Sequence, residues 1–219
     1  MKDGGRAPGL AFPPLPYPAA VCREWLVLQA RAVAVFCGSR SGNDPVALAA
    51  AVALGAGLAA QGVRLIYGGG RVGLMGALAD AVLAGGGQVT GVIPDFLTRM
   101  EVAHAGVLDL RVTDSMHTRK RMMFDMADAF VTLPGGFGTL DETVEVLTWR
   151  QLGLHDKPVI LCNAGGWADP LLAALHSTVA QGYASASSLD LFEVVDGVDD
   201  VLARLMALPA RADAESARL

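Results

Sequence analysis

Residues 133–142 combine a glycine-rich turn, a hydroxyl group and carboxylates within a short stretch of the chain. The residues that shape this turn and the start of the next helix are Pro134, Gly135, Gly136, Gly138 and Thr139. Glycine lets backbone N–H groups approach a ligand closely, and a following helix adds unpaired N–H groups and the positive end of its dipole. Thr139 could also donate its hydroxyl to a phosphate oxygen. The segment therefore predicts an anion site, with phosphate as the usual ligand.

Two roles fit Glu142, the last residue of this segment. The sequence from Thr139 to Glu142 reads T-x-x-E, the capping box in which the glutamate accepts a hydrogen bond from the threonine N–H. Capping explains the spacing without any chemistry, and the spacing alone favours it. The alternative is a carboxylate at the ligand-binding edge, where it could face a sugar and stabilise positive charge or orient water.

A basic segment at 117–121 lies at the start of a predicted amphipathic helix. Arg119 lies three residues after Met116 and four before Met123, so it is expected close to the apolar face of that helix. Its planar guanidinium suits a phosphate or a carboxylate, whereas Lys120 is a point charge. A solvated surface is the usual role of such a run. Here the charges oppose the helix dipole, which favours an anionic ligand or a carboxylate partner.

Two further glycine turns follow apolar runs, one with Gly38 and Ser39 and the other at 68–76. The second turn begins with Gly68, Gly69 and Gly70 and contains G-x-G-x-x-G. It follows the second predicted strand, and no clear acidic residue follows about 20 residues later, as a dinucleotide fingerprint requires. Close packing of a helix on a strand explains this turn as well as phosphate binding does. The convergence of three turns favours phosphate.

Alternating strands and helices are expected to bring these turns together. The expected strands are the apolar runs 32–37, 63–67, 88–93, 107–112, 129–133, 158–162 and 191–195. The expected helices are 45–61, which opens on Asp44 as N-cap and Pro45, then 73–84, 115–127, 140–152, 168–181 and 197–207. Such alternation predicts an α/β fold, a Rossmann-like doubly wound parallel sheet of about seven strands with helices on both faces. Ligands bind at the carboxyl edge of such sheets, where all three turns are expected.

The composition predicts one globular domain. The chain has 219 residues, 53% of them hydrophobic and 18% charged, with a net charge of −5, which argues against a nucleic-acid-binding face. We expect a flexible Pro-rich arm at 1–18, one domain at 19–208 and a frayed tail at 209–219. No secretory signal or membrane-spanning run is evident, so a cytoplasmic location is expected.

The cysteines and histidines predict no metal site. Cys22, Cys37 and Cys162 are widely spaced and form no C-x-x-C, which is typical of reduced thiols. The histidines show no ligand spacing. Glu145 is expected on a solvated face or at an interface, and the stripe of Val146, Trp149 and Leu152 is expected in the core or at a dimer contact.

The sequence at 116–120, M-H-T-R-K, followed by P-G-G-F-G-T-L-D-E at 134–142, resembles the Lonely Guy (LOG) family. These proteins are cytokinin riboside 5′-monophosphate phosphoribohydrolases, long mislabelled as lysine decarboxylases. The likeness continues through 36–39, 67–76 and 148–158 and covers residues 32–205. It implies a homodimer without a cofactor that hydrolyses a purine or cytokinin nucleoside monophosphate, such as AMP, to free base and ribose 5-phosphate.

The resemblance also assigns roles to residues, and it overturns the preference for capping. Arg119 and Glu142 correspond to the catalytic pair. The implied substrate-binding residues are Gly38, Ser39, Gly68, Gly69, Gly70, Met116, Lys120, Pro134, Gly135, Gly136, Gly138, Thr139 and Asp141. Two positions depart from the family pattern: Asp141 stands where glutamate is common, and Arg71 where a small residue is common.

Three other functions compete with hydrolysis. A nucleotide or molybdenum-cofactor carrier would use the same anion site without turnover. A dinucleotide-dependent oxidoreductase is disfavoured by the position of G-x-G-x-x-G. Pyridoxal-dependent lysine decarboxylation is disfavoured because neither Lys120 nor Lys157 has a pyridoxal-site context.

Overall fold

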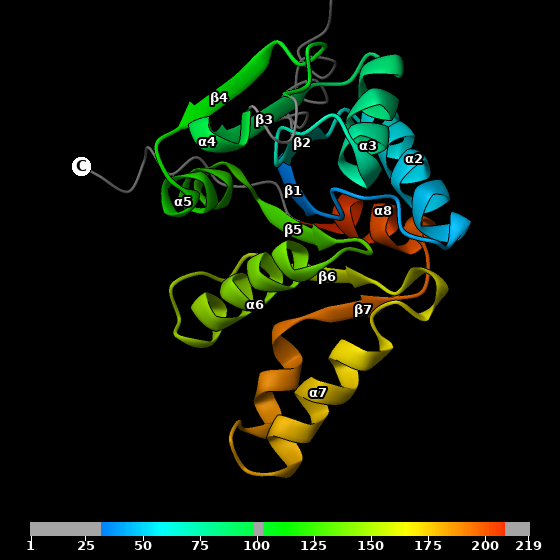
Figure 1. Ribbon diagram of the computed structural model, residues 1–219. Helices are drawn as coiled ribbons and strands as arrows, with labels where there is room; N and C mark the ends of the chain where they lie inside the picture. Colours follow the sequence, from blue (N-terminus) through cyan, green and yellow to red (C-terminus); the bar gives the residue numbers. More distant parts are fainter. Residues whose placement is uncertain (1–31, 99–102, 209–219) are drawn as a thin grey trace, which may run out of the picture.

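The computed structural model describes residues 32–98 and 103–208. The expected N-terminal arm and the expected C-terminal tail lie outside the described residues, as does Cys22. Between them the chain forms one sheet of seven parallel strands, in the order β4-β3-β2-β1-β5-β6-β7 (Figure 1). The strands are β1 (Ala32–Phe36), β2 (Arg64–Tyr67), β3 (Val89–Pro94), β4 (Asp109–Thr113), β5 (Ala129–Thr132), β6 (Val159–Cys162) and β7 (Glu193–Val195). The predicted doubly wound α/β fold is confirmed.

Helices cover both faces of the sheet (Figure 1). They are α2 (Pro45–Ala60), α3 (Gly73–Ala84), α4 (Asp95–Thr98), α5 (Met116–Met126), α6 (Phe137–Gln151), α7 (Asp169–Ala180) and α8 (Val198–Ala207), with short 3₁₀ helices η1 (Ala164–Gly166) and η2 (Ala186–Leu191). One apolar core joins the sheet to α2, α3 and α8. A second core joins the opposite face to α5, α6 and side chains of α7.

The chain changes direction in the sheet between β1 and β5. Strands β2 to β4 are added on one side of β1, whereas β5 to β7 are added on the other. In the register of this pair, Phe36 lies opposite Thr132. The ladder then continues into the loops, because the Gly38 N–H donates to the Pro134 carbonyl at 3.0 Å. This switch point at the carboxyl edge is where ligands bind in open α/β sheets.

Most predicted elements are confirmed, but some differ from the expectation. Asp44 caps α2 as predicted, since its carboxylate accepts the Val46 N–H at 2.9 Å. The outer strand β4 is largely exposed, not buried on both faces, because it lies at an edge of the sheet. The helices α4, η1 and η2 were not predicted, since such short elements leave little periodicity in a sequence.

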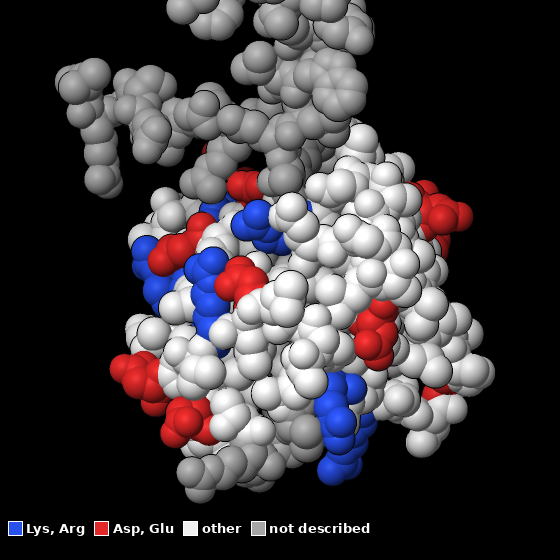
Figure 2. Space-filling view, turned by 90° about the horizontal axis from the view of Figure 1, so that it is seen from above, with Lys and Arg blue, Asp and Glu red and all other residues white. Residues whose placement is uncertain are grey.

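The surface shows no extended basic patch on the face seen in Figure 2. Positive and negative side chains alternate on the left of this view, and a broad uncharged surface at the upper right is bordered by acidic side chains. Among the described residues, no helix is long and apolar enough to cross a membrane.

Candidate active site

A cavity of about 810 Å³ opens at the switch point between β1 and β5. It is lined by the loops that follow β1, β5 and β6, by the first turns of α3 and α6, and by one side chain of α5. The predicted site residues that line it are Gly38, Ser39, Arg119, Pro134, Gly135, Gly136, Gly138, Thr139 and Glu142. The structure thus brings together both residues of the expected catalytic pair and the glycine turns after β1 and β5, and the turn at 68–76 contributes Leu74 and Met75.

The predicted residues that do not line this cavity are Gly68, Gly69, Gly70, Met116, Lys120 and Asp141. Gly68 and Met116 contact the lining residue Arg119. Lys120 and Asp141 pair with each other. Gly69 and Gly70 bond to the segment at 103–104.

The start of α6 presents backbone N–H groups to the cavity. The helix begins at Phe137, with Gly136 as its N-cap, and no side chain caps it. A methyl group added to Gly136 or Gly138 would meet no atom within 4 Å, so the backbone here is open. At Gly135 an added methyl would collide with Thr139. Close packing therefore requires glycine at Gly135, whereas Gly136 and Gly138 leave the approach to the helix start open.

The capping box predicted for Thr139 and Glu142 is wrong. The helix begins two residues before Thr139, which lies inside the first turn and is 3% exposed. The Thr139 carbonyl accepts the Thr143 hydroxyl at 2.7 Å, and Thr143 also bonds Thr132 of β5 at 2.9 Å. These buried hydroxyls tie α6 to the sheet, while the side chain of Glu142 lies near Arg119.

The second glycine turn holds the first in place. The N–H groups of Leu74 and Met75, at the start of α3, donate to the Gly38 carbonyl at 3.0 and 3.2 Å. Gly73 has a φ of +64°, and an added methyl there would collide with the backbone at Ser39 and Arg40. The first amides of α3 are therefore occupied by Gly38. The expected phosphate contact of Gly68, Gly69 and Gly70 stays a prediction, whereas the N–H groups of Leu74 and Met75 are taken by the protein itself.

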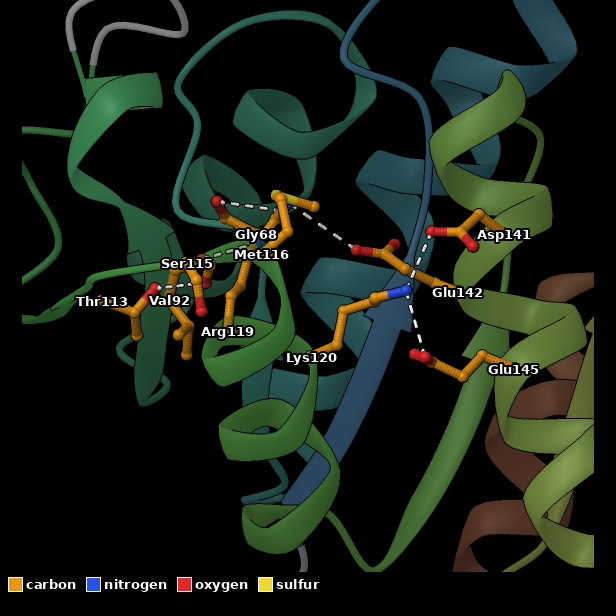
Figure 3. Close-up of polar contacts among 10 residues, drawn as sticks. All are labelled: Gly68, Val92, Thr113, Ser115, Met116, Arg119, Lys120, Asp141, Glu142 and Glu145. Carbon is orange, nitrogen blue, oxygen red and sulfur yellow. Dashed lines mark hydrogen bonds and ion pairs between the residues drawn. The ribbon is translucent and has the colours of Figure 1, made fainter.

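Arg119 is buried, with 6% of its surface exposed, and its guanidinium is fixed by the backbone. Its Nε donates to the Val92 carbonyl at 3.1 Å and its Nη2 to the Gly68 carbonyl at 3.3 Å (Figure 3). A methyl group added to Gly68 would collide with Nη2. Gly68 is thus explained by the space that Arg119 needs. Met116, one turn earlier on α5, places its sulfur 3.7 Å from Nη1.

Glu142 and Arg119 form an ion pair across the cavity wall. The Nη1 of Arg119 lies 3.8 Å from Oε1 of Glu142, and the two side chains are 7% and 11% exposed. Figure 3 shows the carboxylate of Glu142, from α6, turned toward α5. The distance is longer than a direct hydrogen bond. The carboxylate is therefore oriented by the guanidinium and still borders the cavity.

Lys120 bridges α5 and α6 through two carboxylates. Its Nζ lies 3.1 Å from both Asp141 and Glu145 (Figure 3). Burial opposes the charged amine, but the bonds to both carboxylates outweigh it and raise the pKa of Lys120. Glu145 was expected on a solvated face or at an interface. Instead it is 23% exposed and paired with Lys120, because the partner comes from a helix 25 residues earlier in the chain.

Cys37 lines the cavity but is unsuited to nucleophilic chemistry. Burial, together with the negative charge of Glu142, raises the pKa of its thiol well above the usual range. A protonated thiol is a poor nucleophile. Among the described residues, no group of three or more histidines, cysteines or carboxylates could hold a metal ion.

Of the cavity residues that were not predicted as site residues, four carry charged or aromatic side chains: Arg40, Asp44, Phe137 and Trp167. Trp167 follows β6 and η1, and its indole N–H donates to the Gly135 carbonyl at 3.1 Å. The rule that ligands bind at the carboxyl ends of strands could have identified Trp167. The loop after β6 carries no turn as conspicuous as the other glycine-rich ones, so that signal was missed.

Sequence comparisons place relatives across most of this chain. The family model described as "Possible lysine decarboxylase" matches residues 75–205. The chain is 49% identical over 154 residues, 70% of its length, to "Probable cytokinin riboside 5′-monophosphate phosphoribohydrolase LOGL1" of Oryza sativa subsp. japonica, of which the match covers 69%. It is 39% identical over 191 residues to "Cytokinin riboside 5′-monophosphate phosphoribohydrolase" of Rhodococcoides fascians, and the match covers 87% of this chain and 96% of that protein.

Solved structures share the fold at lower sequence identity. The molybdenum cofactor binding protein from Rippkaea orientalis superposes with a TM-score of 0.64 at 22% identity, over 82% of this chain and 98% of that one. At this identity the match supports the fold alone.

Proposed function

Because the chain belongs to the LOG family, whose family model still carries the description of a possible lysine decarboxylase, we propose that it is a phosphoribohydrolase. It cleaves the N-glycosidic bond of nucleoside 5′-monophosphates and releases free base and ribose 5-phosphate. The substrate class is cytokinin riboside 5′-monophosphate, AMP or both. No cofactor takes part in this reaction scheme.

One observation carries the proposal: an uncapped helix start and a buried Arg119–Glu142 pair border the same cavity. The start of α6 suits the 5′-phosphate, because free N–H groups and the helix dipole favour an anion. The carboxylate of Glu142, one turn further along α6, then borders the space beside the phosphate. An anchored phosphate therefore places the ribose near an acidic group.

The reaction proceeds through a ribosyl cation. The C1′–N bond breaks with its electron pair leaving on the base, and positive charge develops on the sugar as in other glycoside hydrolyses. Glu142 stabilises this charge or orients the water that adds at C1′. The water supplies the hydroxyl of ribose 5-phosphate and the proton taken by the base. Arg119 orients Glu142 and, through its bonds to Val92 and Gly68, resists displacement.

The remaining predicted substrate residues act here as supports. Lys120 joins α5 to α6 through Asp141 and so fixes the spacing between the helices that carry Arg119 and Glu142. Met116 packs beside the guanidinium. The shorter Asp141 still reaches Lys120 at 3.1 Å, so the departure from the family pattern leaves this bridge intact.

Product analysis tests the function directly. The protein is incubated with AMP, with other nucleoside monophosphates including an isopentenyladenosine monophosphate, and with the matching unphosphorylated nucleosides. We expect free base and ribose 5-phosphate from the monophosphates and no base from the nucleosides, because the phosphate anchors the sugar. A nucleotide that stays bound and intact would instead favour a carrier.

We also propose a homodimer that pairs the outer face of α6. This face exposes large apolar side chains at Phe137, Val144 and Leu152, with 92%, 43% and 67% of their surfaces accessible, followed by Leu154. Within the predicted stripe, Val146 is buried and Trp149 packs against the second core, so Leu152 is the exposed member. Exposed apolar patches mark interaction surfaces. Phe137 also lines the cavity, so a partner on this face would cover its mouth.

Charge placed on this face is expected to separate the dimer. The double variant Val144→Glu, Leu152→Glu puts two carboxylates where apolar contact is required. Light scattering should give a dimer for the parent and a monomer for the variant. The control is Leu108→Glu, since Leu108 is fully exposed beside β4. A monomeric parent, or a variant that stays dimeric, would refute this interface.

We place the reaction in the cytoplasm. Of the described cysteines, Cys37 and Cys162 are free and buried, as expected for a reducing compartment.

A further inference from the structure

We propose that Arg40 is the specificity-determining residue for the 5′-phosphate, a role that rests on the proposed function. Arg40 follows the first glycine turn and lines the cavity together with the start of α6. Its guanidinium binds the phosphate in the substrate complex and so favours nucleoside monophosphates over unphosphorylated nucleosides.

The other cations near the cavity are held in place by protein groups. Arg119 is buried and bound to two backbone carbonyls, with Glu142 beside it. Lys120 lies between Asp141 and Glu145 and does not line the cavity. Arg40 is exposed, and among the described residues no carboxylate lies within ion-pair distance of it. It is therefore the cavity cation that can turn toward a ligand.

The charge of the ligand requires such a cation. A phosphate monoester carries about −1.5 to −2 charges at neutral pH, whereas a helix start supplies about half a positive charge. Asp44 adds a carboxylate to the same cavity, and Glu142 adds another. Arginine matches phosphate with two parallel N–H···O bonds. Without Arg40, Arg119 would be the only Lys or Arg lining the cavity among the described residues, and its guanidinium is already bound to two backbone carbonyls and paired with Glu142.

The backbone that carries Arg40 is held in one place before the ligand arrives. Gly38 is bonded to Pro134 on one side and to the first amides of α3 on the other. Gly73 packs directly against the backbone of Arg40. Only the side chain has to become ordered on binding, which lowers the entropic cost of the contact.

The test compares Arg40→Gln with Arg71→Gln. Arg71 is a matched control, because it is an exposed arginine in the neighbouring glycine turn and does not line the cavity. We expect Arg40→Gln to raise the KM for AMP about tenfold and to change kcat by less than about threefold, whereas Arg71→Gln leaves both unchanged. The effect should shrink at high ionic strength, since salt screens exposed charges.

A binding experiment separates this proposal from the proposed function. Calorimetry on the Glu142→Gln protein, with and without Arg40→Gln, measures the affinity for AMP, ribose 5-phosphate and adenosine. Loss of affinity for the two phosphates supports the role of Arg40 even if the parent releases no base. Equal affinity of both proteins for AMP overturns it even if the parent hydrolyses AMP. If the protein without the Arg40 change binds neither phosphate compound, both proposals fail.

Discussion

Replacing Glu142 with glutamine is expected to lower the turnover of AMP by about 10²–10⁴-fold. Glutamine keeps the size of the side chain but removes the negative charge that stabilises the ribosyl cation or activates water. The side chain is 11% exposed and is not part of a helix cap, so the fold should be retained. The measurement is kcat at saturating AMP, together with the thermal midpoint of unfolding.

A matched control carries the same chemical change far from the cavity. Glu193→Gln removes a carboxylate that pairs with Arg204 on the surface and should leave turnover unchanged. Turnover of the Glu142→Gln protein within a few-fold of the parent would refute the catalytic role of this residue. A large drop in the midpoint of unfolding would point to a structural role instead.

Replacing Arg119 with glutamine is expected to lower kcat by about 10²–10³-fold and to destabilise the protein by about 1–3 kcal/mol. The change leaves the carbonyls of Val92 and Gly68 without their buried donor and leaves Glu142 without its counter-charge. Both effects follow because this side chain both orients the carboxylate and fills the space beside Gly68. Enzyme kinetics and urea unfolding measure them separately.

The double variant shows whether the two residues act as a unit. If Arg119 works by orienting Glu142, the protein with both changes should be about as inactive as Glu142→Gln alone, because effects of cooperating residues do not add. Fully multiplicative losses would show that Arg119 acts on the substrate independently. Unchanged turnover in Arg119→Gln would refute its assignment.

The sequence predicts well which loops meet at the carboxyl edge of the sheet, and it predicts the roles of individual loop residues less well. Continuous apolar runs identify the buried strands, and the carboxyl-edge rule then brings residues 36–39 and 134–139 together. Both depend on local composition, which a single sequence displays. Arg119 and Glu142 were expected to lie near each other, and in the structure Nη1 of Arg119 lies 3.8 Å from Oε1 of Glu142.

Where the prediction was wrong, contacts between distant segments decide the outcome. T-x-x-E indicated a cap at Thr139, but α6 begins at Phe137, and Thr143 in its next turn bonds Thr132 of β5. The assignment of Gly68, Gly69 and Gly70 to a phosphate site stays a prediction, but the later amides of that turn, at Leu74 and Met75, are bound by Gly38, some 35 residues away. The expected substrate contact of Lys120 also stays a prediction, and its amine is bound by two carboxylates of α6. The spacing of residues within one segment does not indicate hydrogen-bond partners that lie on distant segments of the chain.

The hydrogen bonds from the start of α3 to the Gly38 carbonyl also affect the electrostatics of the cavity. The Gly38 carbonyl and the Ser39 N–H belong to one peptide unit, which is trans and therefore points its N–H away from α3. Two donors on the carbonyl polarise the whole unit, and hydrogen bonds in a chain strengthen one another. The start of α3 therefore polarises the peptide unit between Gly38 and Ser39, and Ser39 lies on the cavity wall. This makes the Ser39 N–H a stronger hydrogen-bond donor than it would be in an isolated loop.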